Sequence, residues 1–248
     1  MDLKQLKEQL ERLSEALSVN DRKVLRARVK SLISVFPFNE YEYVLMFLLD
    51  KKVITFDEYE RLRKDYVSQN RYLELYGLAP RIFGEMWHKH LLEMDSRFQK
   101  PNKSLDPDYN GQYDLWIEGV RVEVKASRAI NTKKKGNLVE KALRYGKDEP
   151  FWMNFQQIKA DMADVFVFIG VWLNKIVYWV LSSEEVKQNP YYSPQHRGGI
   201  EYQIGITEKN IEEFDIYKVN PKKEKLGDVV IKKGKRHKST AETNFPLR

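Results

Sequence analysis

A continuous apolar run, residues 165–172, is the feature that most constrains how this chain can fold. It has the length of a strand, and the turn residues Asn174 and Lys175 separate it from a second apolar segment, residues 176–181. Strands that are apolar at every position are buried on both faces, so other layers must cover them. The two segments therefore predict a hairpin within a central mixed sheet flanked by helices, which is an α/β fold.

The first 70 residues predict an all-helical subdomain. Leucines at positions 3, 6, 10, 13 and 17 fall on one face of a helix over residues 2–18. Asn20 is a candidate N-cap for a second helix, which Pro37 is expected to end. A third helix covers about 40–50, and Thr55 with Glu58 forms a capping-box pattern that begins a fourth. The last two helices have the size of a DNA-binding helix-turn-helix, although such pairs more often only pack together.

Two further helices are predicted around the central strands. Pro80 is acceptable in a first turn, so a helix is expected over about 81–95. A second helix is expected over residues 151–162, with Trp152, Phe155, Ile158 and Met162 as its apolar side. A polar loop, residues 191–199, then precedes a strand over 200–206.

An acidic hairpin is expected before the central strands. Residues 112–117 and 120–127 form its two strands, and Glu118-Gly119 is its two-residue turn. In this register Asp114 lies opposite Glu123, with Cβ atoms about 4.5–5.5 Å apart. Lys125 shares their face, because side chains alternate along a strand.

Opposed carboxylates repel each other unless a cation lies between them. Together with water and the backbone carbonyl of Val124, Asp114 and Glu123 would provide the incomplete oxygen shell that Mg²⁺ prefers. The sequence therefore predicts a metal site with the Lys125 ammonium beside it. The alternative is an exposed Asp-Glu-Lys ladder of weakly stabilising salt bridges.

The pattern of Asp114 followed, after eight residues, by Glu123-Val124-Lys125 resembles the active-site motif of the PD-(D/E)xK nuclease superfamily. Most type II restriction endonucleases belong to this superfamily. Tyr113 stands where the motif has proline. The segments YLELYGLAPRIFGEMWHKHLL (72–92) and FQQIKADMADVFVFIGVW (155–172) also look similar to bacterial restriction endonucleases. The resemblance covers roughly residues 70–215 and implies a restriction-endonuclease-like core over 71–220.

This resemblance implies a Mg²⁺-dependent endonuclease that cuts a short site in double-stranded DNA, with one or two ions in each active site. Asp114 and Glu123 would hold the ion against a phosphodiester oxygen, and Lys125 would act as general base or as electrostatic support. Glu85, on the preceding helix, is implied as an additional metal or outer-shell ligand.

The resemblance also bears on partners. A palindromic site would call for a homodimer, and a cognate DNA methyltransferase is expected as a genetic rather than a physical partner. Two alternatives remain open. One is a structure-selective repair or junction-resolving nuclease of the same superfamily, and the other is a non-catalytic DNA-binding protein.

Three polar segments provide candidate DNA-binding residues. They are the loop after the second hairpin strand, the predicted helix at 151–162 and the loop at 191–199. Lysines suit phosphate contacts, and the amide and ring groups suit base edges, although each segment could simply be solvated. The candidates are Lys133, Lys134, Lys135, Gln156, Gln157, Lys159, Gln195, His196 and Arg197.

Charge and composition set further limits. The formal net charge is +7, yet residues 221–248 hold nine Lys/Arg against three Asp/Glu, and the rest holds 34 against 33. The body is therefore nearly neutral, and the basic C-terminal tail either binds phosphate or is a disordered, solvated segment. The chain has no cysteine, which excludes disulfides and thiolate zinc sites. No apolar run approaches the roughly 20 residues of a membrane span and no signal-peptide pattern is present, so a cytoplasmic protein is expected, and the resemblance implies a bacterial one.

Overall fold

The computed structural model describes residues 3–31, 37–195 and 201–243, and the chain divides into two units. The first unit contains residues 1–77 with two later segments, 135–147 and 172–175. The second contains residues 78–134, 148–171 and 176–248. No helix in the described ranges combines the length and apolarity needed to cross a bilayer.

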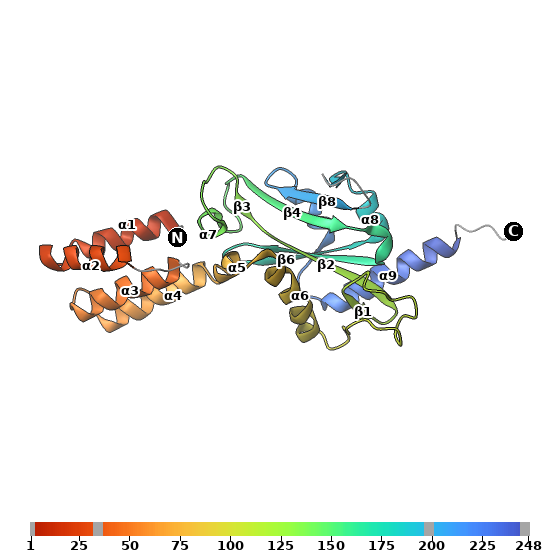
Figure 1. Ribbon diagram of the computed structural model, residues 1–248, viewed down its shortest axis with the longest axis horizontal. Helices are drawn as coiled ribbons and strands as arrows, with labels where there is room; N and C mark the ends of the chain where they lie inside the picture. The colour runs from red at the N-terminus through yellow and green to blue at the C-terminus, as the bar shows by residue number, and fades with distance from the viewer. Residues whose placement is uncertain (1–2, 32–36, 196–200, 244–248) are drawn as a thin grey trace. The chain divides into compact units, whose positions relative to one another are not determined.

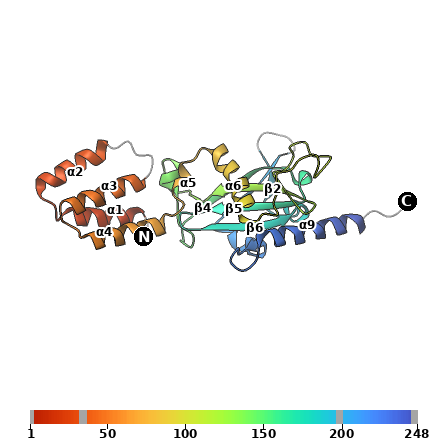
Figure 2. The same ribbon diagram turned by 90° about the horizontal axis from the view of Figure 1, so that it is seen from below.

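The first unit is helical (Figure 2). Its helices are α1 (Leu3–Ser14), α2 (Val19–Ser31), α3 (Pro37–Asp50), α4 (Phe56–Gln69), α5 (Glu74–Gly77) and α7 (Leu138–Lys141). The predicted apolar side of α3 is buried, and Tyr41 on it stacks on Tyr66 of α4 with ring centroids 4.3 Å apart. The capping box at the start of α4 is confirmed, because Thr55 Oγ1 accepts from Glu58 N at 3.2 Å and Thr55 N donates to Glu58 Oε2 at 2.8 Å.

Two predicted helix boundaries in this unit are wrong. Ser18, and not Asn20, precedes α2, and its hydroxyl accepts from Asp21 N at 3.1 Å. Serine and asparagine both cap helices well, so the sequence alone did not show which of the two residues precedes the helix. Pro37 begins α3 instead of ending α2, which fits the first turn of a helix because no N–H is needed there.

A mixed five-stranded sheet is the centre of the second unit (Figure 1). Its strand order is β1 (Leu115–Ile117), β2 (Val120–Arg128), β5 (Val165–Val171), β6 (Ile176–Ser182) and β9 (Lys218–Val219). β2 and β5 are parallel, and the other neighbours are antiparallel. Every residue of β5 is buried, and β6 is its hairpin partner. The predicted apolar hairpin and the α/β class are therefore confirmed.

A second, antiparallel sheet has the order β3 (Ile130–Asn131), β4 (Phe151–Ile158), β8 (Tyr202–Thr207) and β7 (Tyr192–Pro194). The helix predicted at 151–162 is wrong, because residues 151–158 are β4 and only Ala160–Met162 form a short 3₁₀ turn, η1. Phe151, Met153 and Phe155 alternate into the core, and Trp152 between them is 39% exposed. Gln156, Gln157 and Lys159 therefore lie on a strand and just after it.

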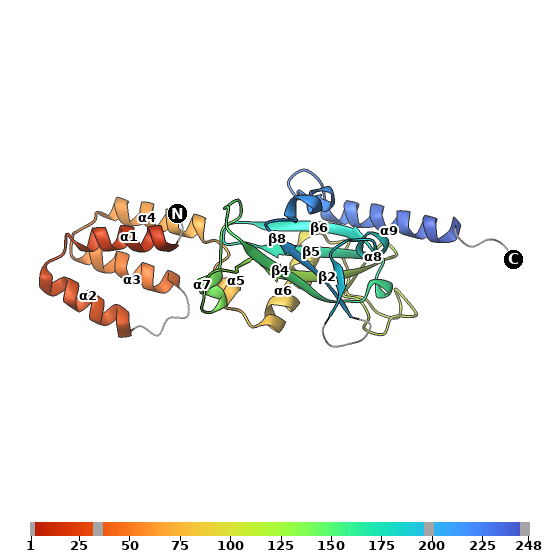
Figure 3. The ribbon, with the colours of Figure 1, turned by 90° about the horizontal axis from the view of Figure 1, so that it is seen from above.

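The two sheets form layers, with β4 and β8 over one face of the central sheet (Figures 1 and 3). The rings of Phe155 on β4 and Phe168 on β5 lie 4.9 Å apart across this interface. Helices α6 (Pro80–Met94) and α9 (Leu226–Thr243) pack against β2, and α8 (Ser183–Lys187) and η2 (Ile211–Tyr217) against β6.

The segment predicted as a basic tail is mostly helix α9, which begins at Leu226. Leu226 and Val230 are buried, and α9 contacts β2, β5 and β6. Gly234 lies so close to β2 that an added Cβ would meet Val120 Cγ1 at 2.5 Å. This part of the segment belongs to the core of the second unit, so it is not disordered.

Candidate active site

The hairpin turn has the predicted position and type. Glu118 and Gly119 both have positive φ, at 43° and 84°, which is the signature of a two-residue turn that matches strand twist. The register of Leu115 with Val122 and of Ile117 with Val120 is also as predicted.

The paired ladder stops at Leu115, one residue before Asp114. Asp114 N donates to Val122 O at 3.0 Å, one residue out of the hairpin register. The carboxylate of Asp114 instead accepts from Val124 N at 2.8 Å. Asp114 thus lies just beyond the ladder, against the free edge of β2, and is not a ladder partner of Glu123.

Four charged or ionisable side chains converge here. Lys125 Nζ lies 2.7 Å from Glu123 Oε1, and these side chains are 18% and 15% exposed. His88 Nε2, from α6, lies 3.3 Å from Asp114 Oδ1, and these side chains are 34% and 23% exposed. The cluster is therefore mostly desolvated but still open to a ligand.

The electrostatics of the cluster are uneven. Burial raises the pKa of Glu123 to about 7, and the nearby charge of Asp114 adds to this. Burial also acts to raise the pKa of Asp114, but the hydrogen bond and charge of His88, with the Val124 N–H, outweigh it and leave that pKa lowered. The same hydrogen bond raises the pKa of His88. The contact therefore favours a charged His88 beside a charged Asp114, and Glu123, with a pKa of about 7, is only partly ionised near neutral pH.

The residues present fit a hard divalent cation. In the described part of the chain, no three His, Cys, Asp or Glu side chains are arranged to hold a metal ion. Asp114 and Glu123 provide two carboxylates, so the Val124 carbonyl and water would have to complete the ligand set. Such an oxygen set suits Mg²⁺. The raised pKa of Glu123 is the sign of a negative charge that a cation would compensate.

Helix α6 places a histidine, and not the predicted glutamate, at Asp114. Glu85 is 59% exposed and its Oε1 accepts from Arg81 Nε at 2.7 Å. His88 lies one turn further along the same helix face. Its position three residues after Glu85 was the only sequence signal that it could take the place of the glutamate. The other histidine of this helix, His90, has a different partner, because its Nε2 lies 2.8 Å from the Tyr178 hydroxyl.

The three candidate lysines, Lys133, Lys134 and Lys135, lie beyond the other end of β2. β2 continues from Lys125 to Arg128 and then into β3, so at about 3.3 Å per residue Lys133 lies up to roughly 26 Å along the chain from Lys125. The backbone N–H groups of Lys133 and Lys134 donate to Asn131 Oδ1. Lys135 belongs to the first unit. DNA contact by these three lysines stays a prediction.

Two of the other candidates meet each other. Gln157 N donates to Gln195 Oε1 at 3.0 Å and so joins β4 to the residue that follows β7. Gln156 is exposed, and Lys159 Nζ lies 3.4 Å from Glu201 Oε1. The two remaining candidates, His196 and Arg197, lie outside the described residues.

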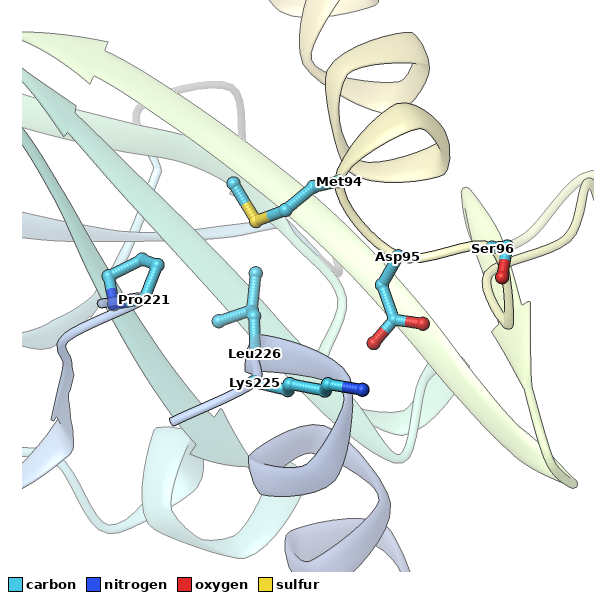
Figure 4. Close-up of a pocket in the computed structure, with 6 residues that line it drawn as sticks. All are labelled: Met94, Asp95, Ser96, Pro221, Lys225 and Leu226. Atoms are coloured by element: carbon cyan, nitrogen blue, oxygen red, sulfur yellow. The ribbon is translucent and has the colours of Figure 1, made fainter. Parts of the chain in front are cut away.

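A separate hollow of about 240 Å³ lies where α6 ends and α9 begins (Figure 4). Met94 and Leu226 point toward each other across it, and Asp95 and Lys225 lie at its side. The hydrogen bond from Arg97 lowers the pKa of Asp95. Neither Asp114 nor Glu123 lines this hollow.

Comparisons of this chain with models of known protein families, with curated proteins and with solved structures give no match. The case for a function therefore depends on the residues of the site and not on the fold.

Proposed function

We propose that this protein is a Mg²⁺-dependent endonuclease that cuts double-stranded DNA at a short specific sequence, as type II restriction endonucleases do. The observation that supports this most is the convergence of Asp114, Glu123 and Lys125 on one partly open edge of β2. A salt-bridge ladder on a solvated face would leave a glutamate near its ordinary pKa, whereas burial and Asp114 raise the pKa of Glu123 to about 7.

Each residue has a separate task in this mechanism. Mg²⁺, when bound, withdraws charge from the scissile phosphate and makes water a better nucleophile. Asp114 and Glu123 would hold the ion, and the bound charge would favour the ionised form of Glu123. Lys125 offsets the negative charge that develops on the phosphate oxygens. His88 orients Asp114 through their 3.3 Å contact.

The proposal extends to the setting of the enzyme. Recognition of a palindromic site would make it a homodimer, since a two-fold site matches a two-fold protein. We place it in the bacterial cytoplasm, where a cognate DNA methyltransferase would protect the host sequence as its genetic partner.

Plasmid cleavage tests this function. With Mg²⁺ we expect discrete fragments from a set of plasmids, and with EDTA we expect none. Lys125→Ala should bind DNA but cut at least about 100-fold more slowly, because one preorganised charge contributes about 3–4 kcal/mol to such transition states. Lys89→Ala is the matched control, since Lys89 is 82% exposed on α6 and pairs only with Glu93 among the described residues.

Each outcome decides between the candidate functions. A smear, or nicking at junctions, would favour the structure-selective nuclease. Binding without cutting in any divalent metal would favour the DNA-binding protein. Normal cutting by Lys125→Ala would remove Lys125 from the mechanism.

A further inference from the structure

We infer that Gln195 determines sequence specificity: its side-chain amide, held by the backbone of Gln157, donates a hydrogen bond to an acceptor on a DNA base edge. This inference rests on the proposed nuclease function and deepens it by naming a residue that selects the substrate. It depends on the conformation of Gln157, on the contact that orients Gln195, and on the position of both along β4 relative to Lys125.

Gln157 has an unusual backbone conformation. In the described residues, three non-glycine residues have positive φ, namely Lys52, Glu118 and Gln157. Lys52 follows the end of α3 and Glu118 is in the hairpin turn, so only Gln157, at φ 57°, lies inside a strand. The pairing of β4 with β8 shifts between Phe155 and Ile158. Such bulges and strained residues concentrate near functional sites.

The bulge orients one amide group. Gln157 N donates to Gln195 Oε1 at 3.0 Å, and Gln195 N donates to Glu201 O at 3.1 Å. With its oxygen held in this way, the side chain of Gln195 presents its NH₂ group in a fixed direction. None of the described residues accepts a hydrogen bond from that NH₂ group. It is therefore a prepared donor that lacks an acceptor within the described chain.

The position of the bulge suits contact with DNA. β3 continues from β2 and pairs antiparallel with β4, and Asn154 N of β4 donates to Ser127 Oγ of β2 at 3.0 Å. Because the strands run in opposite directions, the three residues that follow Asn154, ending at Gln157, lead back toward Lys125. Ser127 and Lys125 share a face, and β4 lies over that face of the central sheet (Figures 1 and 3).

The usual distance between packed sheets is close to the depth of the major groove of DNA. Packed sheets lie about 10 Å apart, and the major groove of DNA is about 8.5 Å deep. A phosphate at Lys125 would therefore leave a base edge near the level of Gln195. An NH₂ donor there selects for acceptors, which are O6 and N7 of guanine, N7 of adenine or O4 of thymine in the major groove.

The test uses substitutions that distinguish the NH₂ donor of Gln195 from the contact of its side-chain oxygen with Gln157 N. Gln195→Glu keeps an oxygen for Gln157 N but loses both N–H donors, and Gln195→Met loses both functions without adding charge. Wild type and each variant are given a randomised-sequence DNA library with Mg²⁺, and the cut ends are sequenced. We expect both variants to lose preference at one base position, by about 10- to 100-fold relative to other positions. The readout is relative preference, so general repulsion between the new carboxylate and DNA does not affect it.

Gln157→Gly tests the other side chain of the pair, because it removes that side chain and leaves the backbone contact. Glycine adopts positive φ freely and keeps the backbone N–H that holds Gln195, so sequence preference should stay at the wild-type level. Wild-type preference in Gln195→Glu would show that Gln195 has only a structural role and would overturn the inference. A loss of preference in Gln157→Gly alone would assign the contact to the Gln157 side chain, which also overturns it.

The proposed function fails in a different way. If the wild-type protein cuts no DNA, the nuclease proposal is lost, and selection of bound DNA from the same library in EDTA then tests Gln195 alone. Cutting without any base preference overturns the inference about Gln195 and leaves a nonspecific nuclease.

Discussion

Glu123 is expected to destabilise the metal-free protein, so Glu123→Gln should stabilise it. Burial and Asp114 raise the pKa of Glu123 from 4.5 to about 7. A carboxyl whose pKa is raised by folding contributes stability that is fully present below pH 4.5 and is lost as the pH rises through 7. At about 1.4 kcal/mol for each pKa unit, the loss is on the order of 3 kcal/mol. Glutamine has a similar shape and never carries the charge.

Urea unfolding in EDTA measures this effect. Relative to wild type, the unfolding free energy of Glu123→Gln should rise by about 1 kcal/mol at pH 5 and by about 3 kcal/mol at pH 8. Glu93→Gln is the control, since Glu93 is 66% exposed and pairs only with Lys89 in the described chain. That exposed substitution should change stability by less than about 0.5 kcal/mol at both pH values.

Mg²⁺ should reduce the difference in stability between the two proteins. A ligand that binds only the folded state raises its stability with concentration, so wild type should gain stability with Mg²⁺ and Glu123→Gln should gain much less. An equal effect of the substitution at pH 5 and pH 8 would refute the electrostatic reasoning. An equal response to Mg²⁺ would remove Glu123 from the metal site.

Two further predictions concern packing and pH. Gly234→Ala should destabilise the protein by about 1–2 kcal/mol in urea, since its Cβ would lie 2.5 Å from Val120 Cγ1. Gly84→Ala, in α6 with no atom within 4 Å of the new Cβ, should instead stabilise it by about 0.5–1 kcal/mol; effects of the same sign would contradict the packing of α9. Burial lowers the pKa of His90 below 6.5, so its contribution is present above pH 6.5 and is lost as the pH falls further. Thermal unfolding from pH 8 to 5 should show a smaller decline in His90→Gln, whose amide replaces Nε2 and can still bond to Tyr178, and an unchanged decline would contradict this.

The sequence predicted the elements whose structure depends on local pattern or on complete burial. Unbroken apolarity identified β5, because a fully buried strand has no polar face to interrupt the run. The turn at Glu118 and Gly119 was predictable since a two-residue loop fixes the register of its strands. The cap at Thr55 followed from two residues three positions apart.

Elements that depend on distant partners were not predictable in this way. Trp152, Phe155 and Ile158 have helical spacing, while Phe151, Met153 and Phe155 have strand spacing, so the pattern supports both structures. The antiparallel pairing with β8, about 50 residues further on, selects the strand. Helix α9 was predicted as a basic tail for a similar reason. Only every third or fourth of its residues contacts the sheet, and the basic residues between them dominate the sequence pattern.

The same distinction applies to the site. Asp114, Glu123 and Lys125 lie on or next to one hairpin, so their proximity was predictable, although Asp114 lies one residue out of register and accepts from Val124 N instead of lying opposite Glu123. His88 reaches Asp114 only because α6 packs against β2, and no pattern near either residue specifies that contact. The hydrogen bond between Gln157 and Gln195 likewise depends on a bulge in β4 that the sequence pattern does not predict.

Two residues of the second unit oppose their own local preferences. Glu123 is a buried acid beside another acid, and Gln157 holds a backbone angle suited to glycine. A structure optimised only for stability would have neither, since strained backbone angles and desolvated acids persist where function requires them. Gln157→Gly should therefore stabilise the protein by about 0.5–1 kcal/mol, independently of pH. The gain from Glu123→Gln should instead grow with pH, and urea unfolding of the double variant should give the sum of the two effects, because the two residues have no shared partner among the described hydrogen bonds and ion pairs.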